Sequence, residues 1–246
     1  MSLRITTLAE RPEFAESLWD MDTAWPEFML NDPIADLFYA VATSHYADYV
    51  LVADDPAEPG RLAARACMIP FTARDGDLPD DGWDAVIRRG WLAREGGRTP
   101  DAVSALEITI RKDLLGGGLS AHMVAAMRAR AARLGFAELV APVRPSQKHL
   151  EPHTPTSEYA FRTRGDGLPY DAWLRVHVRA GGRVEKVAQR SMTISGTLGE
   201  WRGWTGLPFD VDGAVEVPGA LVPVHVDVTH DHAVYVEPNI WVRHPL

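Results

Sequence analysis

The feature that most constrains this chain is a run of three glycines, Gly116–Gly118. It separates an apolar strand-like segment, Val103–Ile110, from a segment with helical spacing, Ser120–Leu134. A tight turn between a strand and a helix leaves backbone N–H groups free at the helix N-terminus, where they bind phosphate oxygens. Glycines let the backbone approach such a ligand without interference from Cβ. The sequence therefore predicts a site for a phosphate-bearing ligand, although glycine-rich helix starts also occur without one.

The rest of the chain reads as alternating strands and helices. We expect strands at Leu3–Leu8, Tyr49–Ala53, Arg61–Phe71, Val103–Ile110, Ala137–Val143, Arg183–Ile194, Leu221–Val228 and Ala233–Val242. We expect helices at Arg11–Trp25, Pro33–Tyr46, Trp83–Arg94, Ser120–Leu134, Asp171–Ala180 and Gly199–Trp204. This order predicts an α/β fold, with a mixed central β-sheet flanked by helices, in a single domain over residues 1–246. The long irregular segments Thr72–Pro100 and Arg144–Pro169 are expected to shape the site of a second substrate rather than that of the phosphate-bearing ligand.

Charge and cysteine content exclude several functional classes. The chain has 25 Lys and Arg against 34 Asp and Glu, a net charge of −9, which disfavours binding to a nucleic-acid backbone or an anionic membrane. The single cysteine, Cys67, excludes an intrachain disulfide and a cysteine-rich zinc site, and is expected to be an inert core residue. No apolar run is long enough for a membrane span, and the first residues lack a signal-peptide pattern, so we expect a cytoplasmic protein.

The glycine turn has two interpretations as a binding site. The spacing Gly116-x-Gly118-x-x-Ala121 fits a dinucleotide fingerprint, which requires an acidic residue at the end of the next strand. That strand ends in Val143-Arg144-Pro145 instead. The dinucleotide interpretation is therefore disfavoured.

The second interpretation is a family resemblance that covers roughly Val103–Ile194. The stretch Leu115-Gly-Gly-Gly-Leu-Ser120 resembles the R/Q-x-x-G-x-G/A motif of the GNAT N-acyltransferase superfamily. The match continues through Ser120–Leu134, Ala137–Val143 and the helix that ends in His177-Val-Arg-Ala-Gly-Gly182, where the family often has Y-x-x-x-G-F. The chain departs from the family pattern at Leu115, Ser120, Gln147 and His177.

The resemblance implies a GNAT-like acyl-CoA-binding fold and an acyl-CoA-dependent N-acyltransferase. Acetyl-CoA would be the co-substrate, with no metal, and a small amine would be the acceptor. No nucleic-acid or membrane partner is implied, and a homodimer is left open. The resemblance assigns cofactor binding to the turn and the end of the preceding strand: Ile110, Gly116, Gly117, Gly118, Leu119 and Ser120.

Three residues are candidates for moving protons. His177 occupies the position of the family's general-acid tyrosine, and could donate a proton as imidazolium or accept one as neutral imidazole. Tyr170 is a substitute donor nearby. Glu107 lies among apolar neighbours on the strand before the turn, where burial would make it a base. Each residue also has an alternative without a catalytic role: His177 could be a histidine that stabilises a helix C-terminus, and Glu107 could face solvent or form a salt bridge.

The sequence leaves two other functions open. A GNAT-like protein with altered motif residues could bind CoA or an acyl carrier without catalysis, or could decarboxylate an acyl thioester on the same scaffold. A metal site is disfavoured, because the residues His225, Asp227, His230, Asp231 and His232 surround an apparent hairpin turn.

Overall fold

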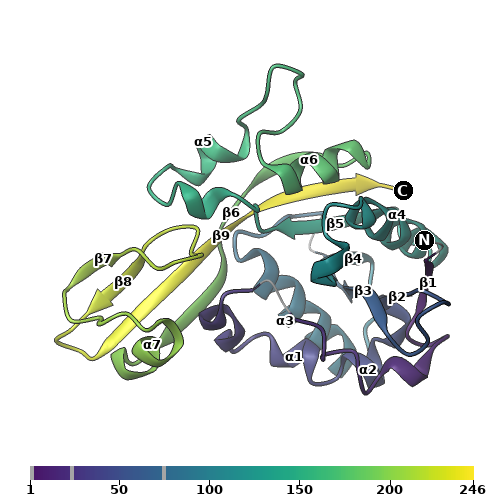
Figure 1. Ribbon diagram of the computed structural model, residues 1–246, viewed down its shortest axis with the longest axis horizontal. Coiled ribbons are helices and arrows are strands. Elements are labelled where there is room, and N and C mark those ends of the chain that lie inside the picture. The colour runs from purple at the N-terminus through teal and green to yellow at the C-terminus, as the bar shows by residue number, and fades with distance from the viewer. Residues whose placement is uncertain (1–2, 23–24, 74–75) are drawn as a thin grey trace.

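The computed structural model describes residues 3–22, 25–73 and 76–246. Its strands form one sheet in the order β1-β2-β3-β4-β5-β9-β8-β7, with β6 paired to β9 (Figure 1). The strands are β1 (Arg4–Thr7), β2 (Val50–Asp54), β3 (Leu62–Phe71), β4 (Ala102–Ile110), β5 (Glu138–Val143), β6 (Arg183–Gly196), β7 (Gly213–Val215), β8 (Val224–Asp227) and β9 (His232–Pro245). All of these pairs are antiparallel except β4 with β5, so the sheet is mixed as predicted.

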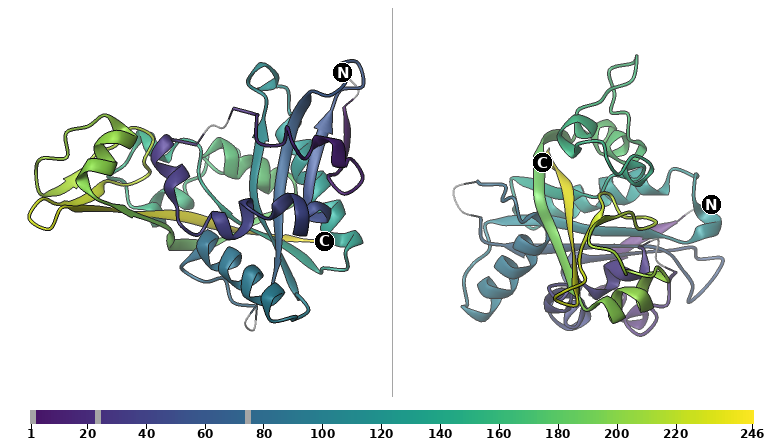
Figure 2. Two further views of the ribbon diagram at one scale, coloured as in Figure 1. Left: turned by 90° about the horizontal axis from the view of Figure 1, so that it is seen from below. Right: turned by 90° about the vertical axis from the view of Figure 1, so that its left-hand side faces the viewer.

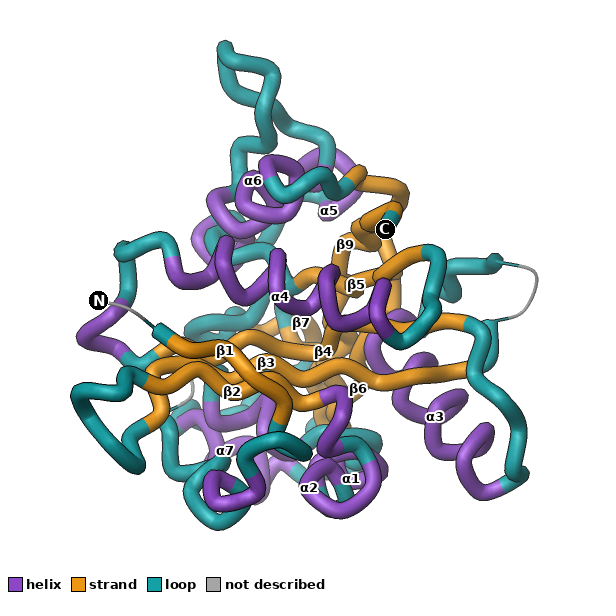
Figure 3. Tube along the Cα trace, turned by 90° about the vertical axis from the view of Figure 1, so that its right-hand side faces the viewer, coloured by secondary structure: helices purple, strands orange, loops and turns teal. Residues whose placement is uncertain are grey.

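Helices cover both faces of the sheet. They are α1 (Asp36–Tyr39), α2 (Ala42–His45), α3 (Gly82–Glu95), α4 (Leu119–Arg133), α5 (Thr156–Ala160), α6 (Ala172–Arg179) and α7 (Leu198–Thr205). Figure 3 shows α4, α5 and α6 on one side of the sheet and α1, α2 and α3 on the other. The layered α/β architecture predicted from the sequence is therefore confirmed.

The central feature of the sheet is that β4 and β5 separate. They pair only at Val103 with Leu139 and at Ser104 with Val140. Beyond that point β5 stays paired with β9 as far as Val143, whereas β4 stays paired with β3. The β4 backbone facing β5 after Ser104 thus has no strand partner within the described residues, and a wedge-shaped opening forms in the middle of the sheet.

A bulge in β4 fixes which side chains face this opening. Cys67 of β3 pairs with Glu107 and Met68 pairs with Ala105, so Leu106 is an extra residue in β4. Such an extra residue bends the strand and re-aims the neighbouring side chains. Simple alternation along β4 could not predict the orientation of Glu107 for this reason.

α4 forms where the sequence predicts it, and its apolar stripe holds it on the sheet. Met123, Met127 and Ala131 are buried together with Val103 of β4 and Leu139 of β5. Burying large apolar side chains of this kind stabilises the fold by about 1.5–3 kcal/mol each. α4 is therefore fixed beside the β4–β5 opening.

The second half of the chain extends away from this opening. β6 and β9 are both 14 residues long, and their paired far ends carry β7, β8 and α7 as a projecting arm (Figures 1 and 2). Trp201 of α7 is buried and donates its indole N–H to the carbonyl of Ala233. The arm thus has an apolar core of its own that continues into the main core.

Two helix predictions are wrong. The predicted helix Arg11–Trp25 contains only a 3₁₀ turn, Pro12–Phe14, and non-helical turns in its described part; residues 23 and 24 lie outside that part. The predicted helix Pro33–Tyr46 is divided into α1 and α2, because Val41 leaves the helical conformation with φ −124° and ψ 5°.

The apolar residues of this region have helical spacing because they all face one core. Phe14, Leu18, Phe28 and Phe38 are almost fully buried, although the backbone follows short turns rather than a long helix. No helix of the described residues is long and apolar enough to cross a membrane.

Candidate active site

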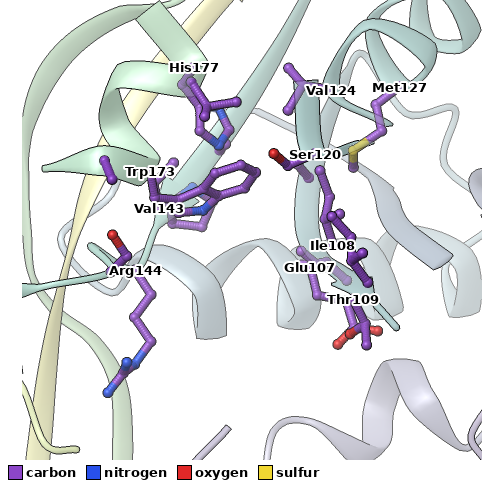
Figure 4. A pocket seen from close by; sticks show the side chains of 18 of the residues that line it. Glu107, Ile108, Thr109, Ser120, Val124, Met127, Val143, Arg144, Trp173 and His177 are labelled. Atoms are coloured by element: carbon purple, nitrogen blue, oxygen red, sulfur yellow. The ribbon is translucent and has the colours of Figure 1, made fainter. Parts of the chain in front are cut away.

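A cavity of about 560 Å³ occupies the opening between β4 and β5. Figure 4 shows it from close by, with Trp173, Val143 and Arg144 on one side and Ser120, Ile108 and Glu107 on the other. Its remaining walls come from the inner faces of α4 and α6, and they are mostly apolar. The fold therefore builds a channel that passes between two helices and reaches the gap in the sheet.

The glycine turn lies at one end of this channel. Leu115 and Ser120, which flank the glycines, and Ile110 line the cavity. Gly116 and Gly118 have φ of +80° and +79°, a conformation that side chains other than glycine rarely adopt, and a Cβ added there would meet nothing within 4 Å. The turn therefore presents open backbone to any ligand at its surface.

α4 begins directly after this turn without a side-chain cap. The first N–H groups of a helix lack intrahelical partners and carry the positive end of the helix dipole. Leu119 contributes only its backbone here, because its side chain is buried in the core under α4. The geometry fits a pyrophosphate group at Gly116, Gly117, Gly118, Leu119 and Ser120.

Glu107 lines the opening, and its side chain is 4% exposed. Its Oε1 accepts a hydrogen bond from Nε of Arg65 at 2.7 Å, and this guanidinium also donates to the carbonyl of Leu18 at 2.9 Å. Burial and the negative charge of Glu107 raise the pKa of the Tyr39 phenol well above its usual value. Glu107 is thus the salt-bridged strand residue considered as an alternative, and it also faces the opening.

Cys67 adjoins the same group, with its Sγ 3.6 Å from Oε1 of Glu107. Burial, and then the charge of Glu107, raises the pKa of the thiol well above its ordinary value. A thiol that stays protonated is a poor nucleophile. This agrees with the prediction that Cys67 is an inert core residue.

A second cavity, of about 310 Å³, lies next to the first. Its walls are largely aromatic, from Trp19, Trp25, Tyr39 and Trp83. Glu107 and Trp25 line both cavities. Glu107 therefore lies where the two spaces adjoin.

His177 also lines the main cavity, from α6, and is 4% exposed. Its Nδ1 is 2.9 Å from Nε2 of His244 on β9. Burial, and then the neighbouring His244, lowers the pKa of His177 to about 3; burial, and then Arg128, lowers that of His244 to about 4. These lowered pKa values favour neutral rings near pH 7 over the predicted imidazolium donor, and the role of His177 in proton transfer stays a prediction. The neutral-imidazole alternative remains.

Tyr170 does not line either cavity. It is 43% exposed, and its ring contacts Tyr159 and the guanidinium of Arg162. The loop before α6 directs it away from the opening. A role as substitute proton donor therefore has no support from its position.

Arg144 follows β5 at the edge of the main cavity and belongs to a buried polar network. Its Nε donates to Oε2 of Glu237 at 2.9 Å, and the same oxygen accepts from the Tyr235 hydroxyl at 2.9 Å. Oε1 of Glu237 accepts from Asn239 at 2.9 Å. This network joins the end of β5 to β9 and holds the opening in shape.

Sequence reasoning missed several of these residues. Arg65 is 42 positions from Glu107, and His244 is 67 positions from His177, so no local pattern connects them. The walls of the second cavity come mostly from residues 19–39, with Trp83 the one contribution from the predicted substrate-site loops. Thr72–Pro100 thus reaches the second cavity only through Trp83, and Arg144–Pro169 lines the main cavity, through Arg144 and Ser146, but not the second one. That these segments shape the site of the second substrate stays a prediction.

Comparison with known proteins agrees with this geometry. No family model matches the chain. Arginine N-acetyltransferase avaD of Aspergillus versicolor is 32% identical, in an alignment that covers 98% of this chain and 93% of that protein. The chain belongs to the GNAT superfamily. The predicted acyl-CoA-dependent N-acyltransferase class is confirmed with it.

Solved structures show the same fold at low sequence identity. The loading GNATL domain of CurA from Lyngbya majuscula superposes with a TM-score of 0.59 at 13% identity, covering 99% of this chain and 96% of that chain. The GphF GNAT-like decarboxylase in complex with isobutyryl-CoA gives a TM-score of 0.56 at 17% identity, covering 100% and 99%. At these identities the likeness establishes the GNAT fold alone.

Proposed function

We propose that this protein transfers the acetyl group of acetyl-CoA to a nitrogen of arginine or of an arginine derivative. The acceptor comes from the similarity to an arginine N-acetyltransferase. The observation that carries the proposal is that two cavities adjoin at Glu107, one reaching the glycine turn and the other walled by aromatic rings. Such an arrangement lets a donor and an acceptor enter from different sides and meet.

The donor side of the site would hold acetyl-CoA along the channel. The turn Gly116–Gly118 and the start of α4 bind the pyrophosphate, and Ile110 contacts the adjoining part of the cofactor. The β4 backbone beyond Ser104, which has no partner strand on that side, hydrogen-bonds the pantetheine arm. Acetyl-CoA supplies an activated acyl carbon at the end of this arm.

The acceptor side would attract and orient the reacting nitrogen. Aromatic rings and a carboxylate favour a cationic ligand. Glu107 accepts a hydrogen bond from that nitrogen and takes its first proton, directly or through water. Arg65 is a positioning residue, because its hydrogen bond to Oε1 fixes the carboxylate of Glu107.

The reaction balances with one acid and one base. The nitrogen loses a proton, its lone pair forms the C–N bond, and the C–S bond breaks with its electron pair on sulfur. The acylated nitrogen loses its second proton, and the thiolate of CoA takes up that proton, directly or through water. The proton held by Glu107 passes to solvent, so one proton is released in each reaction. His177, neutral at pH 7 and hydrogen-bonded to His244, stabilises the thiolate by donating a hydrogen bond rather than a charge.

Acceptor-dependent release of the CoA thiol tests the proposed function. Acetyl-CoA with arginine, its amide or agmatine should release thiol and give an acetylated acceptor by mass spectrometry. Release that is independent of acceptor, or binding of acetyl-CoA without release for every acceptor, would contradict the proposal. Decarboxylation of malonyl-CoA would indicate the alternative thioester chemistry instead.

A charge-matched pair of variants separates catalysis by Glu107 from its structural role. Glu107→Gln should lower kcat by about 10²–10⁴-fold, the usual contribution of a positioned base. It also leaves the buried Arg65 unpaired, which destabilises the fold. The double variant Arg65→Met/Glu107→Gln removes both charges and should recover thermal stability without recovering kcat. Recovery of kcat together with stability would show that Glu107 acts only in folding.

A further inference from the structure

The second cavity has an uneven distribution of charge. Its charged lining residues are two carboxylates, Asp36 and Glu107, and one guanidinium, Arg65. Arg65 is already engaged, because its Nε and Nη1 donate to Glu107 and to the carbonyl of Leu18. A ligand in this cavity therefore meets negative charge that its lining does not neutralise.

Asp36 is the carboxylate that remains available. It lies at the start of α1, is exposed, and lines the cavity. Among the described residues no hydrogen bond or ion pair reaches its side chain. Asp32, four residues earlier, is different: it is buried, and its side chain accepts the backbone N–H of Ile34 at 2.8 Å. The side chain of Asp36 thus makes no hydrogen bond within its own segment.

The two carboxylates have different surroundings. Glu107 is buried next to the main cavity, whereas Asp36 is open to solvent. The same cavity is lined by aromatic side chains that contact one another: the ring of Tyr39 is 5.3 Å from that of Trp19 and 6.3 Å from that of Trp83. Aromatic faces attract organic cations and the alkyl chains that carry them. The cavity is therefore suited to a molecule that carries one positive group at the buried Glu107 and a second at the exposed Asp36.

We propose that Asp36 is a specificity-determining residue, which selects acceptors that present a second cationic group at the outer end of this cavity and no free carboxylate there. This inference rests on the proposed function, since it takes the reacting nitrogen to lie beside Glu107. The favoured substrate class is a dication, such as agmatine or an arginine whose carboxyl group is blocked as an amide or peptide bond. Free arginine brings a carboxylate that Asp36 repels.

The expected effect is modest and specific. An ion pair that is partly open to water changes binding by about two- to fivefold, and salt weakens it. Asp36→Asn should therefore raise KM for agmatine and arginine amide by about that factor, with kcat nearly unchanged. For free arginine the same substitution removes a repulsion as well as an attraction, so kcat/KM should stay level or rise.

The experiment compares arginine, arginine amide and agmatine in wild-type protein, Asp36→Asn and a control, Asp20→Asn. Asp20 is exposed on the same N-terminal segment and lines neither cavity, so its substitution removes the same charge elsewhere. The decisive quantity is kcat/KM for arginine amide divided by kcat/KM for arginine. For each variant this ratio is divided by the wild-type ratio, which cancels the different intrinsic reactivities of the two acceptors.

We expect the normalised ratio to be about two- to fivefold below one in Asp36→Asn and to stay at one in Asp20→Asn. In the wild type, kcat/KM for arginine amide divided by kcat/KM for arginine should fall as ionic strength rises. An unchanged ratio in Asp36→Asn overturns the inference while leaving the proposed function intact. An equal fall in Asp20→Asn overturns it too, because net charge would then be the cause. If the wild type acetylates none of the three acceptors, the proposed function fails and takes the inference with it.

Discussion

Replacing His177 by phenylalanine should change how the stability of the protein depends on pH. The His177 ring is buried, and its pKa is lowered from 6.5 to about 3 by burial and then by His244. The unfolded chain therefore binds a proton on this residue at a pH where the folded protein does not. For a group with a depressed pKa in the folded state, stability is present above the unfolded pKa and is lost as pH falls below it.

The magnitude follows from the distance between the assay pH and the unfolded pKa. An assay at about pH 5 is about 1.5 units below the pKa of this histidine in the unfolded chain, so the unfolded chain is protonated there. The pKa of about 3 keeps the folded residue neutral at the same pH. At roughly 1.4 kcal/mol per unit, His177 lowers the free energy of unfolding by about 2 kcal/mol between pH 8 and pH 5. A phenylalanine side chain at this position does not titrate and has no such dependence.

The assay is urea unfolding of wild type and His177→Phe across this pH range, with His122→Gln as the control. His122 is exposed on α4, so the control removes a histidine without touching the contact between His177 and His244. The difference between variant and wild type cancels the other titrating groups, including buried carboxyls with the opposite pH dependence. From pH 8 to pH 5, the free energy of unfolding of His177→Phe should rise by about 2 kcal/mol relative to that of the wild type. A difference that stays constant with pH would refute a buried, neutral His177.

Three further substitutions test other parts of the structure. Gly118→Val forces a β-branched residue into a left-handed conformation at the start of α4. Acetyl-CoA affinity by calorimetry should fall at least about tenfold, whereas Gly165→Val, in an open loop and outside the left-handed region, should bind normally. Burial, and then Asp32, raises the pKa of Asp84 to about 9, so the wild type loses stability as pH rises toward that value. The free energy of unfolding of Asp84→Asn, measured in urea, should therefore rise relative to that of the wild type by roughly 1 kcal/mol per pH unit between pH 5 and pH 8. A difference that stays constant with pH would contradict a protonated Asp84. Lys148→Met removes a fully buried ammonium that donates to the carbonyls of Glu151 and Leu221 at 2.7 and 2.8 Å. This substitution should lower the free energy of unfolding by about 3 kcal/mol in thermal or urea unfolding. A loss no larger than that of Lys186→Met, which removes a partly exposed ammonium paired with Asp80, would refute this role.

The elements around the donor site could be predicted because their signals are local. The glycine turn, the apolar stripe of α4 and the Asp171 cap of α6 all lie within a few residues of the structure that they specify. Asp171 accepts the backbone N–H groups of Trp173 and Leu174, as an N-cap residue should. The order strand, turn, helix, strand, helix was therefore readable from the sequence.

The acceptor side could not be predicted in the same way. Most of its walls come from residues 19–39. Prolines at 26 and 33 and the buried Asp32 divide this part of the backbone into short turns, although its apolar residues have the spacing of a helix. The neutral state of His177 depends on a partner at the other end of the chain. The orientation of Glu107 depends on the bulge at Leu106. Each of these features arises from tertiary contacts.

A crystal structure of the complex with CoA and arginine amide tests the central claim most directly. The account predicts the pyrophosphate at the backbone N–H groups of Leu119 and Ser120, the thiol in the opening between β4 and β5, and a nitrogen of the acceptor beside Glu107. The rest of the acceptor should occupy the aromatic cavity. An acceptor bound in the channel between α4 and α6, or a pyrophosphate away from the glycine turn, would contradict the account.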